Sequence, residues 1–234
     1  MDTLPELADT LARIADIGYT SVQISATCPY EPEWMAEQLK KNGLTCELTH
    51  YNFDRIMNDT EAVIAEHKTM GCSYIGVGGV QNEELFDEKG HEAAKKIADA
   101  GMLLMLHNHD KEYSETRDGK SKMLYYADAF GKNEVGFTLD LYWAEYAGHS
   151  AFDELKRLSG RVPVVHYKDM IITPDGEKKF APVGSGVLDY EALTEAAIEA
   201  GTQIAYVEQD NCYGEDPFAC LKQSFDYLRS IGLM

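Results

Sequence analysis

The chain has 234 residues, and 44% of them are hydrophobic, so it is long and apolar enough to bury a core of its own. Its formal net charge is -19, which repels both the phosphates of nucleic acids and anionic membrane surfaces. The composition therefore excludes disorder, and we expect no nucleic-acid partner and no membrane partner.

Five cysteines are scattered along the chain, and no two of them form a CxxC pair. An odd number of scattered cysteines indicates reduced thiols rather than a disulfide framework or a zinc ribbon. No signal peptide is visible at the N-terminus, and no apolar run approaches the roughly 18 residues that span a membrane. We therefore expect a cytoplasmic protein.

Two patterns alternate along the chain. The first has apolar residues at helical spacing and begins in residues 3–18, where Leu4, Leu7 and Leu11 share one face. The second is a short apolar run that is typical of a buried parallel strand. The expected strands are 19–25, 44–50, 73–79, 102–108, 135–141, 162–168 and 203–209. The further expected helices are 31–42, 58–70, 88–100, 120–130, 150–159, 189–200 and 216–230.

This order of elements predicts an α/β fold, the (β/α)8 TIM barrel, with a parallel sheet inside and helices outside. One strand is missing from the eight, and it would precede Leu4, where only three residues stand. We therefore expect the first strand to be lacking or truncated. An open edge of this kind invites pairing with another chain, which makes a homo-oligomer one expectation. No linker divides the sequence, so we expect a single domain, residues 1–234.

Ionisable side chains stand at the ends of four expected strands. They are His107 and His109, Asp140, the trio His166, Lys168 and Asp169, and the pair Glu208 and Asp210. Because the carboxyl ends of parallel barrel strands open onto one face, we expect these groups to share a site. A mixed nitrogen and oxygen set without thiolates suits Mn²⁺, Mg²⁺, Co²⁺ or Zn²⁺. Taken singly, each residue also has an ordinary explanation, such as a rim histidine, a turn cap or an ion-pair partner.

Further candidates surround these strand ends. Trp143 offers an aromatic face that stacks on a sugar or packs in the core, and His50 and Glu112 are candidates for substrate contact. We expect a tight turn at residues 76–79, because the glycine spacing of a phosphate loop is absent. The glycines of residues 182–190 suit a loop beside the substrate, a lid, or a plain loop.

The strand ends and the loops after them read HNHDKEY, TLDLYWAEYAG, VVHYKDM, PVGSGVLDY and YVEQD. In this order they resemble the xylose isomerase-like TIM-barrel superfamily, and most of all its sugar phosphate isomerase/epimerase branch. The resemblance covers almost the whole chain and implies a divalent metal ion. The metal ligands that it implies are His107, Asp140, His166 and Glu208. His107 stands where the superfamily usually has glutamate, so one of two opposing acid/base groups becomes a histidine here.

The resemblance implies a metal-dependent isomerase or epimerase of a small sugar or keto-polyol. Such an enzyme removes a proton next to a carbonyl and passes through an enediolate that the cation stabilises. The expected catalytic residues are Glu208 and His109, which suit proton transfer, and Lys168, which suits a developing oxyanion.

Three alternatives remain open at the level of sequence. A lyase or dehydratase acting on a keto-sugar uses the same enolate and the same metal site. A degenerate barrel binds a sugar without catalysis, and the missing first strand favours it. A phosphodiester hydrolase of the endonuclease IV kind shares the barrel, but the net charge of -19 argues against it.

Overall fold

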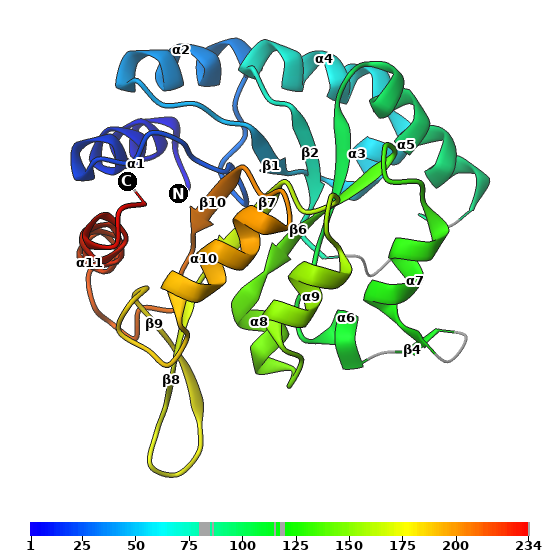
Figure 1. The fold of residues 1–234 in the computed structure, drawn as a ribbon. Coiled ribbons are helices and arrows are strands. Elements are labelled where there is room, and N and C mark those ends of the chain that lie inside the picture. Colours follow the sequence, from blue (N-terminus) through cyan, green and yellow to red (C-terminus); the bar gives the residue numbers. More distant parts are fainter. Residues whose placement is uncertain (80–84, 86, 115, 118–119, 234) are drawn as a thin grey trace. The chain divides into compact units, whose positions relative to one another are not determined.

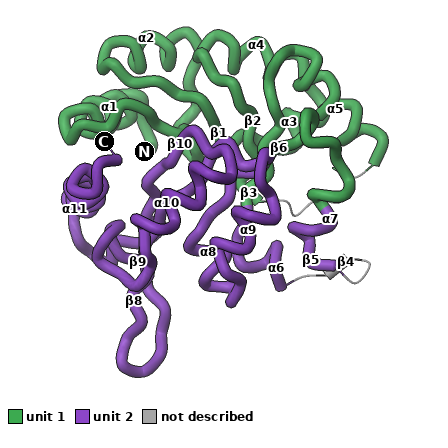
Figure 2. Tube along the Cα trace, viewed as in Figure 1, with its two compact units in different colours: residues 1–107, 126–136 green, residues 108–125, 137–234 purple. Residues whose placement is uncertain are grey.

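A computed structural model describes residues 1–79, 85, 87–114, 116–117 and 120–233 (Figure 1). The chain divides into two compact units, each with its own parallel strands and helices (Figure 2). Unit 1 contains residues 1–107 and 126–136, and unit 2 contains residues 108–125 and 137–234. The chain passes from one unit to the other after His107, within α7 (Lys122–Ala129) and within β6 (Val135–Asp140).

Unit 1 pairs three strands in parallel, with β2 in the middle. They are β1 (Leu48–His50), β2 (Tyr74–Val77) and β3 (Leu103–His107). Its helices are α1 (Leu4–Ile17), α2 (Pro32–Asn42), α3 (Phe53–Asn58), α4 (Thr60–Met70) and α5 (Glu88–Asp99). Helix α2 packs against α1 and α4, and α4 packs against α5, so these helices form a layer beside the strands (Figure 1).

Local signals explain where the helices of unit 1 begin and end. The Thr3 side chain caps α1 by accepting the Glu6 amide hydrogen, and Pro5 lies in the first turn. Helix α4 ends at Gly71, whose φ of +82° is a left-handed conformation that glycine adopts without strain. These helix boundaries lie close to those that the sequence predicts.

The expected strand at 19–25 is wrong as a regular strand. Two isolated bridges join Ser21 to Thr45 and Ile24 to Thr49. The bridged residues are three positions apart on one segment and four on the other, so a regular ladder cannot continue between them. Val22 and Ile24 are nevertheless buried, as their apolar character predicts. Residues 1–3 form no strand either.

Unit 2 also pairs three strands in parallel, with β7 in the middle. They are β6, β7 (Val164–Tyr167) and β10 (Ile204–Val207). Its helices, besides the first part of α7, are α6 (Lys111–Ser114), α8 (Leu141–Tyr146), α9 (Ala151–Arg157), α10 (Tyr190–Glu199) and α11 (Pro217–Ser230). Every residue of β6 is buried, which explains its unbroken apolar run.

Two short antiparallel hairpins in unit 2 have no counterpart among the predicted elements. They are β4 (Thr116–Arg117) with β5 (Lys120–Ser121), and β8 (Asp169–Ile172) with β9 (Lys178–Ala181). The β8–β9 hairpin projects from its unit and turns at a Pro-Asp-Gly sequence that ends at Gly176 (Figure 1). Across the described parts of the chain, no helix combines the length and the apolar character needed to cross a membrane.

Candidate active site

Asp140 is the last residue of β6 and lies in register with His166 of β7. The Asp140 side chain caps α8, because its Oδ1 accepts the Trp143 amide hydrogen at 2.9 Å. Asn108 holds the Asp140 backbone from the other side. The Asn108 amide donates to the Asp140 carbonyl at 3.1 Å and accepts from its N–H at 2.8 Å. Two sets of hydrogen bonds therefore fix a buried carboxylate at this strand end.

Asp140, His166 and Glu208 bring three potential metal ligands together. Their ligand atoms all lie within 4.8 Å of one another. His166 Nδ1 lies 3.0 Å from Glu208 Oε2 and 3.7 Å from Asp140 Oδ2. One imidazole and two carboxylates form the mixed donor set that suits Mn²⁺, Mg²⁺, Co²⁺ or Zn²⁺. The chemistry of these residues therefore fits a divalent cation.

Lys168 lies among three carboxylates beside these ligands. Its Nζ is 2.9 Å from Glu208 Oε2 and 3.0 Å from Asp140 Oδ2. It also lies 3.0 and 3.1 Å from the two carboxylate oxygens of Asp210. Lys168 is buried, whereas the Glu208 side chain is 38% exposed. The site therefore combines a buried ammonium with a glutamate whose side chain is partly exposed while its Oε2 is buried.

Charge partners outweigh burial in setting the pKa values of Lys168 and Glu208, but not that of Asp210. Burial by itself lowers the pKa of Lys168, but Asp140, Glu208 and Asp210 hold that pKa above its usual range. Burial by itself raises the pKa of Glu208, but His166 and Lys168 hold that pKa well below its usual range. For Asp210, burial prevails over Lys168 and raises the pKa.

His109 and Trp143 lie next to each other, with ring centroids 5.6 Å apart. The His109 side chain is 36% exposed. The Trp143 ring centroid lies 5.7 Å from Lys168 Nζ, so these three predicted site residues gather in one place. Glu112 is buried, and its carboxylate accepts the His109 amide hydrogen at 2.7 Å. Glu112 therefore shapes the turn that carries His109.

His50 and His107 belong to unit 1, where they end β1 and β3. Their ring centroids lie 4.9 Å apart. Gly76 lies in β2, so the expected turn at 76–79 is shorter than predicted. A Cβ on Gly78 would stand 3.0 Å from His50 Nδ1, so this glycine makes room for the imidazole. The role of His107 as a metal ligand stays a prediction.

Asp169 organises the glycine-containing loop at residues 182–190. Its Oδ2 accepts the amide hydrogens of Gly184 and Gly186, both at 2.9 Å, and its Oδ1 accepts that of Leu188 at 3.2 Å. A Cβ on Gly184 would clash with the ring of Tyr227. The glycines therefore serve close packing against an aromatic ring and a carboxylate.

The sequence places Asp169 and Asp210 among the ionisable residues at the strand ends without assigning either a role, and it does not select Asn108. A signal for Asp210 exists, because it stands two residues after Glu208 just as Lys168 stands two residues after His166. Asn108 and Asp169 act through hydrogen bonds to distant backbone groups, and no local pattern marks such partners.

The family model described as the xylose isomerase-like TIM barrel matches residues 11–231. The chain therefore belongs to the xylose isomerase-like TIM barrel family, which confirms the predicted family and fold class. Members of this family include sugar isomerases, epimerases and dehydratases, which makes an enzyme the expected kind of protein.

An inosose dehydratase of Geobacillus kaustophilus (strain HTA426) is 23% identical, over 97% of this chain and 90% of that protein. A sugar phosphate isomerase/epimerase from Parabacteroides distasonis ATCC 8503 has a TM-score of 0.80 at 20% identity, covering 98% of this chain and 90% of that one. A xylose isomerase-like TIM barrel protein from Mycobacterium smegmatis, solved in complex with magnesium, has a TM-score of 0.73 at 16% identity, covering 97% and 88%. Structural likeness at these identities shows the fold alone.

Proposed function

We propose that this protein is a divalent-metal-dependent enzyme that isomerises or epimerises a sugar or keto-polyol by moving a proton next to a carbonyl. The observation that carries the proposal is the convergence of Asp140, His166 and Glu208 within 4.8 Å. These three residues would hold the ion, and the family resemblance adds His107 as a fourth. A bound divalent cation supplies Lewis acidity, which draws charge from a carbonyl and acidifies the neighbouring C–H.

The protein's own residues supply the other parts of this chemistry. Glu208 and His109 are the two groups suited to moving the proton, since both side chains are partly exposed. Lys168 donates hydrogen bonds to an oxyanion on the substrate, which requires it to release one of its carboxylate partners. Trp143 lines the site next to His109, where its ring offers a face to a sugar.

A dehydratase is the second candidate. The similarity to an inosose dehydratase over 97% of this chain favours it. Elimination of water from a keto-polyol begins with the same proton removal and then expels a neighbouring hydroxyl group. The same residues therefore serve both reactions, and only the product distinguishes them.

The test of the metal site is elemental mass spectrometry of the purified protein. We expect a stoichiometric divalent ion that is lost from His166→Ala and from Glu208→Ala. Glu215→Ala is the matched control, because this glutamate is exposed and outside the cluster. Wild-type protein without a divalent ion after incubation with Mn²⁺ would contradict the proposal and favour a sugar-binding barrel without catalysis.

The test of the reaction is incubation of the metal-loaded protein with keto-sugars and inososes in D₂O. An isomerase or epimerase yields a product of the same composition with deuterium in place of one C–H hydrogen. A dehydratase yields a product that lacks water. His109→Gln should abolish either product while the metal stays bound, if His109 moves the proton.

We further propose that residues 1–234 act as a single domain, because the family model spans residues 11–231. All five cysteines are free thiols, which supports a cytoplasmic location. Self-association stays a prediction, which light scattering after size-exclusion chromatography checks.

A further inference from the structure

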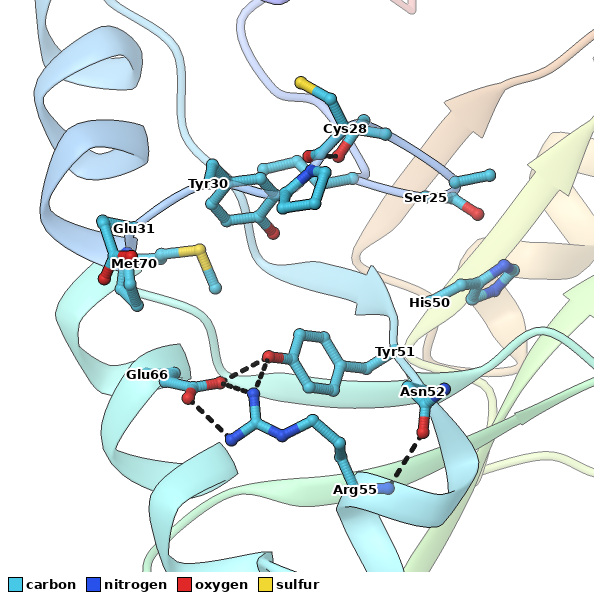
Figure 3. A pocket seen from close by; sticks show the side chains of 15 residues that line it. Ser25, Cys28, Tyr30, Glu31, His50, Tyr51, Asn52, Arg55, Glu66 and Met70 are labelled. Carbon is cyan, nitrogen blue, oxygen red and sulfur yellow. Dashed lines mark hydrogen bonds and ion pairs between the residues drawn. The ribbon is translucent and has the colours of Figure 1, made fainter. Parts of the chain in front are cut away.

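Unit 1 contains a cavity of about 760 Å³ (Figure 3). Residues 24–32 form one wall of it. The other lining residues are His50, Tyr51, Asn52, Arg55, Glu66 and Met70. Cavities of roughly 300–1,000 Å³ suit small-molecule ligands. All of its lining residues belong to unit 1.

The guanidinium that lines this cavity is already paired with a carboxylate. Arg55 makes a two-pronged ion pair with Glu66, at 2.9 Å to Oε1 and 3.1 Å to Oε2. Of the described residues that line the cavity, Arg55 is the sole lysine or arginine, and the second carboxylate is Glu31. A phosphate group therefore finds no uncompensated cation here.

Neutral hydroxyl groups and rings complete the walls. Tyr51 accepts a hydrogen bond from Arg55 at 2.8 Å and donates one to Glu66. Burial, aided by Glu66, raises the pKa of Tyr51 to about 12, and burial likewise raises the pKa of Tyr30. The Tyr30 hydroxyl points into the cavity from the wall opposite Tyr51, and the Ser25 side chain points toward His50 (Figure 3). Aromatic faces beside uncharged donors complement a sugar ring.

The wall at residues 24–32 has a strained backbone. Ala26 lines the cavity with a φ of +49°, a left-handed conformation that residues with a Cβ rarely adopt. Such strain persists only where surrounding structure holds it, and it concentrates at ligand sites.

We propose that this cavity binds an uncharged, hydroxyl-rich group, a sugar ring or polyol without phosphate. This inference names the substrate class of the function proposed above and rests on that proposal. His50 lines the cavity, and its ring centroid lies 4.9 Å from that of His107, which also belongs to unit 1.

The experiment is titration of the full-length, metal-loaded protein with D-fructose and sucrose as neutral probes and D-fructose 6-phosphate as the charged probe. Isothermal titration calorimetry or ligand-observed NMR gives the dissociation constants. We expect the neutral probes to bind more tightly than the phosphate ester. Tyr30→Phe should weaken their binding about three- to tenfold, the effect of one lost hydrogen bond. Tyr74→Phe is the matched control, because Tyr74 lies in β2 and does not line the cavity.

Glu66→Gln provides an independent test, because it removes the charge that matches Arg55. This variant should bind D-fructose 6-phosphate more tightly than wild type does. The proposal is overturned if wild type prefers the phosphate ester, or if Tyr30→Phe binds the neutral probes as wild type does.

Metal content separates failure of this inference from failure of the proposed function. If the protein holds a divalent ion but Tyr30→Phe does not weaken the binding of the neutral probes, the cavity assignment is overturned and the metal site stands. Tyr30-dependent binding in a protein that takes up no metal supports the cavity and overturns the metal-dependent function.

Discussion

Lys168 and Asp140 form an ion pair removed from solvent, with Nζ 3.0 Å from Oδ2 and side chains that are 2% and 0% exposed. Burying two opposite charges costs desolvation energy, which is recovered only when each charge has further partners. Lys168 has such partners in Glu208 and Asp210, and Asp140 has one in the Trp143 amide. The pair therefore depends on a complete network.

Replacing Lys168 should show how far the stability of the protein depends on this network of charges. We expect Lys168→Met to lower the free energy of unfolding by about 3–5 kcal/mol, because carboxylates remain buried without their cation. Urea unfolding in buffer containing a chelator measures this. Lys95→Met is the control, since its pair with Asp99 is exposed on both sides and should contribute less than about 1 kcal/mol. If both substitutions lowered the free energy of unfolding equally, the stabilising role of the Lys168 network would be contradicted.

Asn108→Ala should weaken both the fold and the metal site. The substitution leaves the buried N–H and C=O of Asp140 without their partner amide. We expect a loss of about 1–3 kcal/mol in the free energy of unfolding and a lower metal content. Asn133→Ala changes an exposed asparagine and should stay within about 0.5 kcal/mol of wild type. Full metal retention by Asn108→Ala would argue against Asn108 as a positioning residue.

Asp169→Asn tests the loop at 182–190. The Asp169 carboxylate accepts amide hydrogens of the loop. An asparagine side chain has only one acceptor oxygen, and its NH₂ group is itself a donor that cannot accept these hydrogens. We expect about 1–3 kcal/mol of destabilisation and faster proteolytic cleavage within the loop. Asp226→Asn, at an exposed aspartate of α11, is the control. Unchanged cleavage rates in both variants would show that Asp169 does not restrain the loop.

His67 should make stability depend on pH. It is buried, and it bonds to Thr49 Oγ1 through Nε2 and to the Val63 carbonyl through Nδ1, both at 2.7 Å. Burial lowers the pKa of His67 below its usual 6.5. As the pH falls, the imidazole of His67 is therefore protonated at a higher pH in the unfolded state than in the folded state. The stabilisation of the folded state that is present above pH 6.5 is lost as the pH falls below 6.5.

The measurement is the free energy of unfolding of wild type and His67→Gln between pH 8 and pH 5. The variant has no imidazole at this position, so its stability should fall less steeply across that range. His149→Gln, which replaces an exposed histidine, should keep the wild-type slope. Parallel curves of the free energy of unfolding against pH for wild type and His67→Gln would contradict the prediction.

The order of most strands and helices follows from the sequence because each leaves a local pattern. The apolar run of β6 and the capped amphipathic α1 are examples. Helices α3 and α8 are too short to show helical periodicity, and the β8–β9 hairpin follows β7 without an intervening helix. The expected strand at 19–25 fails because its pairing loses register with residues 45–49, which no property of 19–25 alone reveals.

The sequence by itself marked three residues that the structure brings together, although their role in a site stays a prediction. Asp140 ends β6, His166 is the penultimate residue of β7 and Glu208 directly follows β10, and the carboxyl ends of parallel strands meet at one edge. Only the tertiary structure decided the pairing of charges, such as Arg55 with Glu66 and Lys168 with Asp210. An ion pair depends on distances between side chains that local sequence does not encode, because the fold as a whole sets them.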